Sequence, residues 1–353
     1  MPNMAASQHP RASISVPVRN AAPWLAECLD SVLAQSERDF EVLAVDDGSD
    51  DGSAEILQHY ALEHSRLRVL HTPPADRGIV AALNLALAQA AAPILVRMDA
   101  DDRMHPDRVA KQCAVLDADP SLLGVASRAA AFPQEQLRDG MRAYLDWQNG
   151  LLTPEENARE RFIESPILHP SVALRTDVVR ERLGGWRDRG WPEDWDLFLR
   201  AMGCGLRIGR IPEVLVEWRL HPAQLTRQHP RYAESALLAA RASFLADHLA
   251  AHVEPGRPIQ ILGAGPVGKA LIKALTACGA TIEGLTDVDP RKVGGVVRGG
   301  GHAWRVTAIS QLRARSLRPF ALSAVAGAPA RAGVRAELAS WGWREGLDFV
   351  VAA

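Results

Sequence analysis

The stretch Ile94-Leu-Val-Arg-Met-Asp99-Ala-Asp101-Asp102 decides the fold, because an apolar run ends abruptly in three carboxylates. A short apolar run bounded by polar residues predicts a buried strand. A second stretch has the same form, with the apolar segment Val42–Val45 followed by Asp46-Asp47-Gly48-Ser49-Asp50-Asp51. In open α/β sheets, ligands bind beyond the carboxyl ends of the strands. Both acidic clusters therefore stand where a ligand is expected.

Strand and helix patterns alternate on either side of these clusters. Between the expected strands Ser13–Val18 and Phe40–Val45, apolar residues from Leu25 to Leu33 recur at the spacing of one helix face. Further strands are expected over Leu67–His71 and Pro93–Met98. This order predicts an α/β protein with a doubly wound, mostly parallel sheet. Beyond it the pattern becomes irregular and mostly helical, with one more strand expected over Pro170–Leu174.

A second, smaller alternating unit follows the linker-like segment Val253-Glu-Pro-Gly-Arg-Pro258. It carries Gly263-Ala-Gly265-Pro-Val-Gly268 between an expected strand and an expected helix, and Asp287 follows the last of these glycines by nineteen residues. This is the dinucleotide-binding fingerprint, in which the glycines let phosphates approach and the acid binds a ribose. Nucleotide binding there, including NAD(P), is left open against an empty Rossmann-like scaffold.

These patterns predict the following domains. Residues 1–12 form a disordered lead, and residues 13–254 form the first domain. Within it lie a first half over 13–130, a second half over 131–230 and a linking helix over 231–254. Residues 257–353 form a Rossmann-like accessory domain.

Composition excludes several classes of function. The chain of 353 residues has 47% hydrophobic and 23% charged residues, which suits two globular domains. The net charge of −2, without a block of basic residues, argues against a nucleic-acid partner. Four widely spaced cysteines predict neither a disulfide framework nor a zinc site, which fits a cytoplasmic protein.

One uncharged stretch, Ile79–Val96, has the length of a membrane span. It contains Asn84, Gln89 and Pro93, so a helix followed by a buried strand is favoured and no transmembrane segment is expected. Attachment to the inner face of a membrane and the oligomeric state are left open.

The spacing of Asp99 and Asp101 indicates a metal site. Residues two apart in extended backbone project to the same face. Paired carboxylates suit a hard cation such as Mg²⁺ or Mn²⁺, which takes oxygen ligands and leaves positions for phosphate oxygens. The alternative is that the acids occupy a solvated turn and cap the next helix.

Four motifs together resemble the family 2 glycosyltransferases, whose fold is called GT-A. The family opens on Pro-x-Tyr-Asn, continues to Val-Asp-Asp-Gly-Ser and reaches Asp-x-Asp at the end of a later strand. This chain has Pro17-Val-Arg-Asn20, Val45-Asp-Asp-Gly-Ser49, Arg77-Gly-Ile79 with Leu83-Asn84, and Arg97-Met-Asp-Ala-Asp-Asp102. Arg19 replaces the usual Tyr, and Asp76 stands where Asn is common; these departures concern the preferred base and sugar and not the fold.

The resemblance makes residues 13–130 the nucleotide-sugar donor half and residues 131–230 the acceptor half, and it implies roles for individual residues. The nucleotide would be bound by Pro17, Asn20, Asp46, Asp47, Gly78 and Asp99. The metal would be held by Asp101 and Asp99, with His221 approaching it from the segment Trp218-Arg-Leu-His-Pro222. Carboxylates are hydrogen-bond acceptors only, so they suit a uracil imide N–H and ribose hydroxyls.

The segment Trp191-Pro-Glu193-Asp194-Trp195 resembles the family's Glu-Asp motif at the start of a helix facing the acceptor. A sugar hydroxyl is a poor nucleophile, and a nearby carboxylate can take its proton. Asp194 is the predicted base, with Glu193 orienting it or binding the acceptor. The alternative is a merely acidic helix N-terminus, which the helix dipole favours without any function.

Three residues are predicted to bind the acceptor on weaker signals. His169 and Arg219 could line its cleft, and Trp191 could stack on a sugar face. Each also has a structural alternative, because an isolated His or Trp more often belongs to the core or its rim.

The predicted function is transfer of a sugar, with inversion, from a nucleotide-sugar such as a UDP-sugar to a hydroxyl in glycan or polysaccharide biosynthesis. Inversion comes from the family resemblance alone. A saccharide, a lipid-linked glycan or a protein could supply the hydroxyl. Two alternatives are an NAD(P)-dependent oxidoreductase using the second domain and a non-catalytic module that binds sugar nucleotides.

Overall fold

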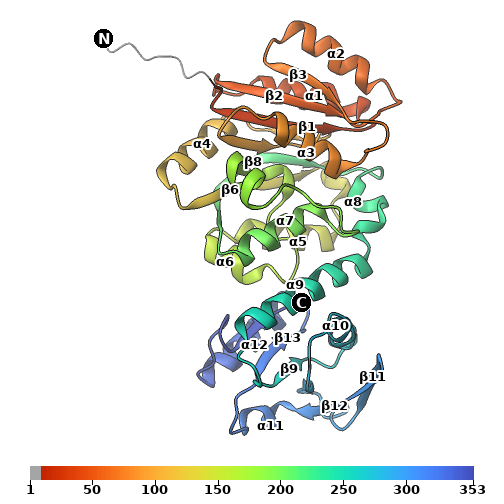
Figure 1. Cartoon of the computed structure of the whole chain (residues 1–353), viewed down its shortest axis with the longest axis vertical. Coiled ribbons are helices and arrows are strands. Elements are labelled where there is room, and N and C mark those ends of the chain that lie inside the picture. The colour runs from red at the N-terminus through yellow and green to blue at the C-terminus, as the bar shows by residue number, and fades with distance from the viewer. Residues whose placement is uncertain (1–8) are drawn as a thin grey trace. The chain divides into compact units, whose positions relative to one another are not determined.

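The structure, a computed structural model, describes residues 9–353 and divides into two compact units (Figure 1). The first unit comprises the chain up to Asn157 together with Pro166–Arg189 and Glu193–Gln228. The second comprises Ala158–Ser165, Gly190–Pro192 and His229–Ala353. Of the lead predicted over 1–12, residues 1–8 lie outside the described residues.

An eight-stranded sheet forms the centre of the first unit, in the order β3-β2-β1-β4-β7-β6-β8-β5. Neighbours from β3 to β4 are parallel, β6 and β8 are parallel, and β7 runs antiparallel to both β4 and β6. The short β5 pairs antiparallel with β8. The bounds are β1 Ala12–Val18, β2 Phe40–Asp46, β3 Leu67–His71, β4 Ile94–Arg97, β5 Arg103–Met104, β6 Leu122–Phe132, β7 Ala173–Arg175 and β8 Arg207–Arg219.

Helices cover both faces of this sheet. One face of β1 and β2 packs Ile14, Val16 and Val42 against Leu25 and Leu29 of α1, and α3 packs on β1 and β2. The helices are α1 Ala22–Leu33, α2 Ser53–Glu63, α3 Ile79–Gln89, α4 Arg108–Ala118, α5 Asp139–Gly150, α6 Pro154–Glu160, α7 Glu193–Gly203 and α8 Leu225–Gln228. Shorter turns are η1 Gln134–Gln136, η2 His169–Ser171 and the π-helical η3 Val178–Arg182.

The strand expected over Pro170–Leu174 is only partly formed. The chain instead makes the turn η2 and enters β7 at Ala173. Pro170 has a fixed φ and no N–H to donate to a sheet, which explains why extended pairing begins after it.

The second unit contains a six-stranded sheet in the order β11-β12-β10-β9-β13-β14. All neighbours are parallel except β11, which forms an antiparallel hairpin with β12. Without β11, the order read along the chain is 3-2-1-4-5, which is typical of Rossmann folds. The bounds are η4 Pro230–Tyr232, α9 Glu234–His252, β9 Ile259–Leu262, α10 Pro266–Ala277, β10 Gly284–Asp287, β11 Val296–Gly299, β12 His302–Ala308, α11 Ile309–Arg313, β13 Phe320–Ser323, α12 Ala328–Ser340 and β14 Phe349–Val351.

The sheet of the second unit confirms the Rossmann-like prediction for its fold. In the described part of the chain, no helix combines the length and hydropathy that a membrane crossing requires.

Candidate active site

The predicted nucleotide residues meet at the carboxyl ends of β1 and β2. Asn20, just after β1, has a left-handed backbone with φ of 50°. Its side-chain oxygen accepts the Asp50 N–H at 2.9 Å, and its own N–H donates to Ser49 Oγ at 3.1 Å. These bonds join the loops after two parallel strands, and Pro17 lies in β1 directly before them.

Asp46 and Asp47, at the end of β2, are both buried. Asp46 accepts the Ser49 N–H at 3.1 Å. Asp47 accepts the Thr72 hydroxyl at 2.7 Å and the Gly78 N–H at 2.9 Å. Asp47 therefore fixes the turn that begins α3, and its role toward a base or ribose stays a prediction.

Arg77, which stands directly before Gly78, is a further candidate for the site because of its position. A side chain at Gly48, where φ is 73°, would lie only 2.3 Å from the Arg77 guanidinium carbon. Because Gly48 has no side chain, the Arg77 guanidinium can pack against the acidic loop. A phosphate of the nucleotide is a suitable partner for this cation.

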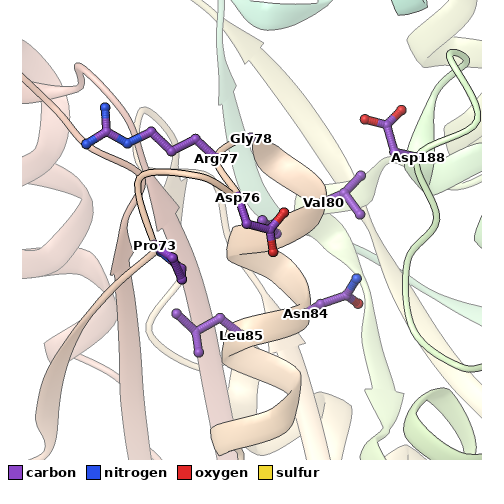
Figure 2. Close-up of a pocket in the computed structure, with 9 residues that line it drawn as sticks. Pro73, Asp76, Arg77, Gly78, Val80, Asn84, Leu85 and Asp188 are labelled. Carbon is purple, nitrogen blue, oxygen red and sulfur yellow. The ribbon is translucent and has the colours of Figure 1, made fainter.

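A pocket of about 350 Å³ opens beside the start of α3 (Figure 2). In the figure, Asp76 and Asp188 stand on either side of Val80 and Asn84, and Arg77 points away from them. Nine residues line the pocket: Pro73, Asp76, Arg77, Gly78, Val80, Ala81, Asn84, Leu85 and Asp188. Of the residues predicted to bind nucleotide, it includes only Gly78, and it contains none of the acidic cluster after β4.

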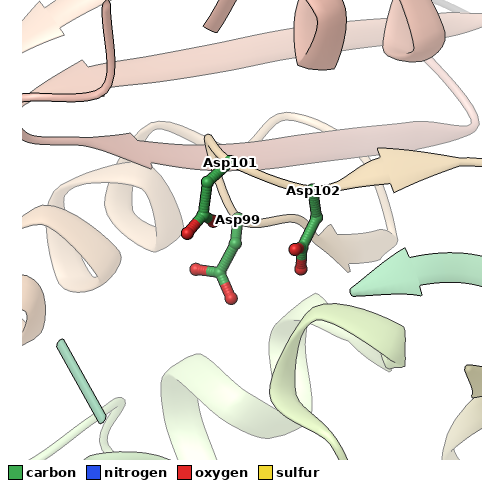
Figure 3. Close-up of side chains that lie close together, drawn as sticks. All are labelled: Asp99, Asp101 and Asp102. Carbon is green, nitrogen blue, oxygen red and sulfur yellow. The ribbon is translucent and has the colours of Figure 1, made fainter. Parts of the chain in front are cut away.

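That cluster brings Asp99, Asp101 and Asp102 together. One oxygen from each carboxylate lies within 4.8 Å of the others. Figure 3 shows the three side chains leaving one loop toward the same side. Asp99 also pairs with Arg97, the last residue of β4, at 2.6 Å. The predicted proximity of Asp99 and Asp101 is present, and Asp102 joins them.

The segment after β8 closes over this loop. His221 Nε2 lies 2.8 Å from an Asp101 oxygen, and Trp24 of α1 stacks on the His221 ring with centroids 3.8 Å apart. The Arg219 guanidinium donates to the Asp101 carbonyl at 2.6 Å and also contacts Glu27. Arg219 thus clamps the acidic loop, and its predicted contact with an acceptor stays a prediction.

Asp102 is fully buried, and one of its oxygens accepts the Arg219 N–H at 2.7 Å. Its other oxygen has no hydrogen-bond partner among the described residues. Burial, together with Asp101 and Asp99, raises the pKa of Asp102 well above its usual range, and burial also raises the pKa of Asp99. An unpaired oxygen among three crowded carboxylates fits a divalent cation, which would offset their mutual repulsion.

Glu193 and Asp194 begin α7. An Asp194 oxygen accepts the Trp195 N–H at 2.7 Å. Burial, and next the neighbouring Glu193, raise the pKa of Asp194 to about 7, although Arg97 opposes the rise. A carboxylate with a pKa near neutrality is suited to accept a proton from a substrate.

Behind α7, His169 faces the protein interior. Its Nε2 accepts the Trp186 indole N–H at 3.2 Å, which leaves the proton on Nδ1. That Nδ1 lies 3.9 Å from a Glu193 oxygen, which is too long for a direct hydrogen bond. Burial lowers the pKa of His169 well below its usual value, so the ring is neutral. His169 is thus a buried, neutral ring bonded to Trp186, and its predicted contact with the acceptor stays a prediction.

Asn84 fixes the loop that carries Trp186. Its amide donates to the Trp186 carbonyl and accepts the Trp186 N–H, both at 2.9 Å. These two bonds hold α3 against the loop of Trp186, although Asn84 and Trp186 are 102 residues apart in the sequence.

The glycine-rich loop of the second unit is built as a Rossmann turn. Gly263 has φ of 103°, and a side chain at Gly268 would lie 1.8 Å from the Gly263 carbonyl oxygen. Gly265 is the residue directly before α10. Asp287 accepts the Ala264 N–H at 2.7 Å and pairs with Lys292 at 3.0 Å. A ribose hydroxyl could bind the Asp287 carboxylate only alongside the hydrogen bond that Asp287 already accepts from the glycine-rich loop.

Trp191 belongs to the second unit, where its ring meets Phe244 edge to face with centroids 6.4 Å apart. This ring contact is with Phe244 and not with a residue of the first unit, so the stacking of Trp191 on a sugar stays a prediction.

Sequence reasoning did not single out Arg97, Asp102 or Trp24. Arg97 and Asp102 stand inside the quoted motif, so their position was an available signal. Trp24 had none, because its partner His221 comes from a remote part of the chain.

Comparison with known proteins supports the resemblance to family 2 glycosyltransferases. Residues 13–183 match the family described as Glycosyl transferase family 2. EpsE of Bacillus subtilis strain 168, which carries the name of a glycosyltransferase, is 29% identical over 213 residues, covering 60% of this chain and 73% of EpsE. The amylovoran biosynthesis glycosyltransferase AmsE of Erwinia amylovora is 28% identical over 197 residues, covering 55% of this chain and 70% of AmsE.

Among solved structures, TarS of S. aureus in complex with UDP-GlcNAc aligns with a TM-score of 0.54 at 18% identity. The alignment covers 76% of this chain and 80% of TarS. At this identity the likeness concerns the fold, and it confirms the predicted GT-A class. The family match ends before α7, so Glu193 and Asp194 rest on their geometry. Residues 13–183, just under half of this chain, thus match the model of glycosyl transferase family 2, and relatives of the chain carry the names of glycosyltransferases.

Proposed function

We propose that this glycosyltransferase moves a sugar from a nucleoside diphosphate sugar, such as a UDP-sugar, to a saccharide hydroxyl, with inversion at the anomeric carbon. One observation carries the proposal most directly. After β4, one carboxylate oxygen from each of Asp99, Asp101 and Asp102 lies within 4.8 Å of the others. Such a cluster suits a divalent cation bound to the diphosphate of a donor.

The donor is held, in this proposal, at the carboxyl ends of β1, β2 and β4. Asn20 and Asp47 fix the loops around the nucleotide, and Arg77 meets its phosphates. Asp99, Asp101 and Asp102 would hold a Mn²⁺ or Mg²⁺ ion. The ion would supply positive charge to the nucleoside diphosphate as it leaves.

Asp194 then acts on the acceptor. It takes the proton from the attacking hydroxyl as the new bond to the anomeric carbon forms. Attack on the face opposite the leaving diphosphate inverts that carbon. Because the pKa of Asp194 is about 7, part of this carboxylate is ionised at neutral pH, and it is a stronger base than an ordinary carboxylate.

Relatives suggest the setting of the reaction. AmsE is named for the biosynthesis of amylovoran, and TarS was crystallised with UDP-GlcNAc. We infer that this chain also acts on a UDP-sugar and contributes to a polysaccharide.

A thermal-shift screen tests this proposal. UDP, GDP, dTDP and their common sugars are each added with and without MnCl₂, because a ligand that binds only the native state raises Tm by mass action. We expect UDP to raise Tm only when Mn²⁺ is present. Equal Tm values in every well would contradict the proposed donor site.

A non-catalytic sugar-nucleotide module is the second candidate, and hydrolysis of the stabilising nucleotide-sugar would distinguish it from an enzyme. The oxidoreductase alternative has weaker support, because Asp287 is already bonded to the glycine-rich loop. Adding NAD⁺ and NADP⁺ to the same screen tests whether the second unit binds either.

A further inference from the structure

The end of the chain carries far more positive charge than the rest. Residues 257–353 contain 13 Lys and Arg against 6 Asp and Glu, which is a net charge of +7. The preceding 256 residues contain 27 basic and 36 acidic residues, which is a net charge of −9. The overall value of −2 therefore conceals a strong asymmetry, and charge concentrated in one domain indicates an anionic partner for that domain.

Much of this positive charge is already paired within the second unit. Four arginines form ion pairs at 2.9 Å: Arg257 with Asp348, Arg291 with Asp289, Arg315 with Glu283 and Arg335 with Glu345. Lys292 pairs with Asp287 at 3.0 Å. The cations that are available to an anionic partner are those that lack such a carboxylate.

The hairpin of β11 and β12, at one edge of the sheet, has two different faces (Figure 1). Val297 and Trp304 lie opposite each other and are buried, so one face packs on the second unit. Because side chains alternate along a strand, the other face carries Val296, Arg298 and Arg305, and all three are exposed. The register places Val296 opposite Arg305. The exposed face is therefore both aliphatic and cationic.

Two lysines of α10 extend this cationic surface. A side chain at Gly299, directly after Arg298, would lie 2.9 Å from Lys273 Cε, so the Lys273 side chain packs against the tip of the hairpin. Lys269 stands four residues before Lys273, on the same side of α10. In the part of the chain that the structure describes, neither these two lysines nor Arg298 and Arg305 have a carboxylate within 4.0 Å.

The tip of the hairpin, Gly299-Gly300-Gly301, has no side chains. Gly300 and Gly301 have φ of 56° and 79°, a conformation that favours glycine. Such a tip lets the cations beside it approach a flat surface. The four side chains of the exposed face, Val296, Arg298, Ala303 and Arg305, include no aromatic ring on which a nucleic-acid base would stack.

We propose that this hairpin surface, defined by Lys269, Lys273, Val296, Arg298 and Arg305, binds the anionic phospholipids of a membrane. The ammonium and guanidinium groups pair with lipid phosphates, and Val296 enters the boundary between headgroups and acyl chains. Each Lys or Arg close to an anionic bilayer strengthens binding about fivefold. All five residues belong to the second unit, so the inference does not depend on the proposed sugar transfer.

Sedimentation of the full chain with vesicles tests the proposal. One set of vesicles contains equal parts of phosphatidylglycerol and phosphatidylcholine, and the other contains phosphatidylcholine alone. We expect the protein to sediment with the anionic set only. It should dissociate as NaCl is raised from about 0.1 M to about 1 M, because salt screens the attraction. Absence of binding, or equal binding to both sets, would overturn the proposal.

Two matched double variants locate the surface. Arg298→Gln with Arg305→Gln removes two charges from the hairpin and should lower the partition constant by about 25-fold. Arg318→Gln with Arg344→Gln removes two exposed charges that precede β13 and β14, the strands farthest from β11 in the sheet. This control should lower binding by about threefold or less, because those charges lie beyond the reach of screened attraction. Tm checks that both proteins are folded, and equal losses in binding would contradict the hairpin assignment.

Other polyanions provide the competing arms. Heparin and oligouridylate are each added to the protein on anionic vesicles. If either binds more tightly than the vesicles and loses its binding with Arg298→Gln and Arg305→Gln, the surface belongs to a glycan or a nucleic acid and the proposal is wrong. The hairpin variant should keep the wild-type response to UDP and Mn²⁺, so failure of the membrane site and failure of the donor site are read separately.

Discussion

Asp194 combines two properties that separate a base from a helix cap. It begins α7, where any carboxylate is favourable, but burial and then Glu193 raise its pKa to about 7. Asp194→Asn keeps the shape and cannot accept a proton. We expect turnover of the nucleotide-sugar to fall by about 10²–10⁴-fold, measured as release of nucleoside diphosphate. Near-normal turnover would move the base elsewhere, first to Glu193.

Although Asp194→Asn should lower turnover, it should increase the stability of the folded protein above pH 7. The folded pKa of Asp194 lies above its unfolded value, so the folded state binds more protons between about pH 4 and pH 7. Its contribution to stability therefore falls as pH rises through that window. Asp194→Asn should raise Tm at pH 8 and leave it nearly unchanged at pH 4.

Asp196 provides the contrast on the same helix. It pairs at 2.6 Å with Arg200, which donates to the carbonyls of Leu183 and Gly185. Asp196→Asn should lower Tm at pH 8. A matching loss at Asp194 would show that both residues serve only the helix.

Asp101 tests the cation site. Its carboxylate lies beside Asp99 and 2.8 Å from His221. Asp101→Asn should abolish the stabilisation by UDP that depends on Mn²⁺, because an amide is a weaker ligand for a hard cation. Tm without ligand checks that the variant is folded, and an unchanged response to Mn²⁺ and UDP would remove Asp101 from the site.

At the scale of elements, the contact between α3 and the loop before α7 shapes the first unit. Asn84 makes two hydrogen bonds to the Trp186 backbone, and Asn84→Ala leaves both backbone groups without partners. We expect a loss of about 1–3 kcal/mol in the free energy of unfolding, measured by urea denaturation.

Gln89, at the exposed end of α3, is the control for that experiment. Among the residues that the structure describes, its side chain bonds only to the surface residue Arg68, so Gln89→Ala should change stability by about 0.5 kcal/mol or less. Similar losses from both substitutions would mean that the helix, and not its contact with Trp186, was disturbed.

Periodicity and motif order predicted the strands and helices of the donor half well, because those signals are local. A strand was predicted close to β7, but its antiparallel direction was not, since nothing within Ala173–Arg175 specifies the direction of its neighbours. The same limit applied to the site. The proximity of Asp99 and Asp101 was predicted from extended backbone, but the two residues lie in a turn in which the Asp102 N–H donates to the Asp99 carbonyl at 3.3 Å. The closure by His221 and Arg219 depends on how β8 enters the sheet.

At the scale of the whole molecule, we expect a substitution in one compact unit to change the stability of that unit without changing ligand binding by the other. A side chain at Gly268 would meet the Gly263 carbonyl at 1.8 Å, and no flexible atom can give way. Gly268→Ala should therefore destabilise the second unit and lower the Tm of its unfolding. The stabilisation by UDP and Mn²⁺ should persist, because its residues belong to the first unit.

Gly265 is the matched control, since a side chain there would have no other atom within 4 Å. Gly265→Ala should leave Tm near that of wild type. If Gly268→Ala abolished the response to UDP and Mn²⁺ below its own Tm, the second unit would have to be part of the donor site.

The closure of the acidic loop also has a consequence for how the protein is made. Asp102 and the Arg219 N–H that it binds are 117 residues apart, and among the described strands β5 pairs only with β8. A ribosome adding about 5–20 residues per second needs roughly 6–23 s to cover that distance. From the completion of β6 at Phe132 until β8 has been made, the edge of β6 that later pairs with β8 is open, and an unpaired strand edge invites association with other chains. The nascent chain is therefore most exposed to aggregation just before its candidate active site can close.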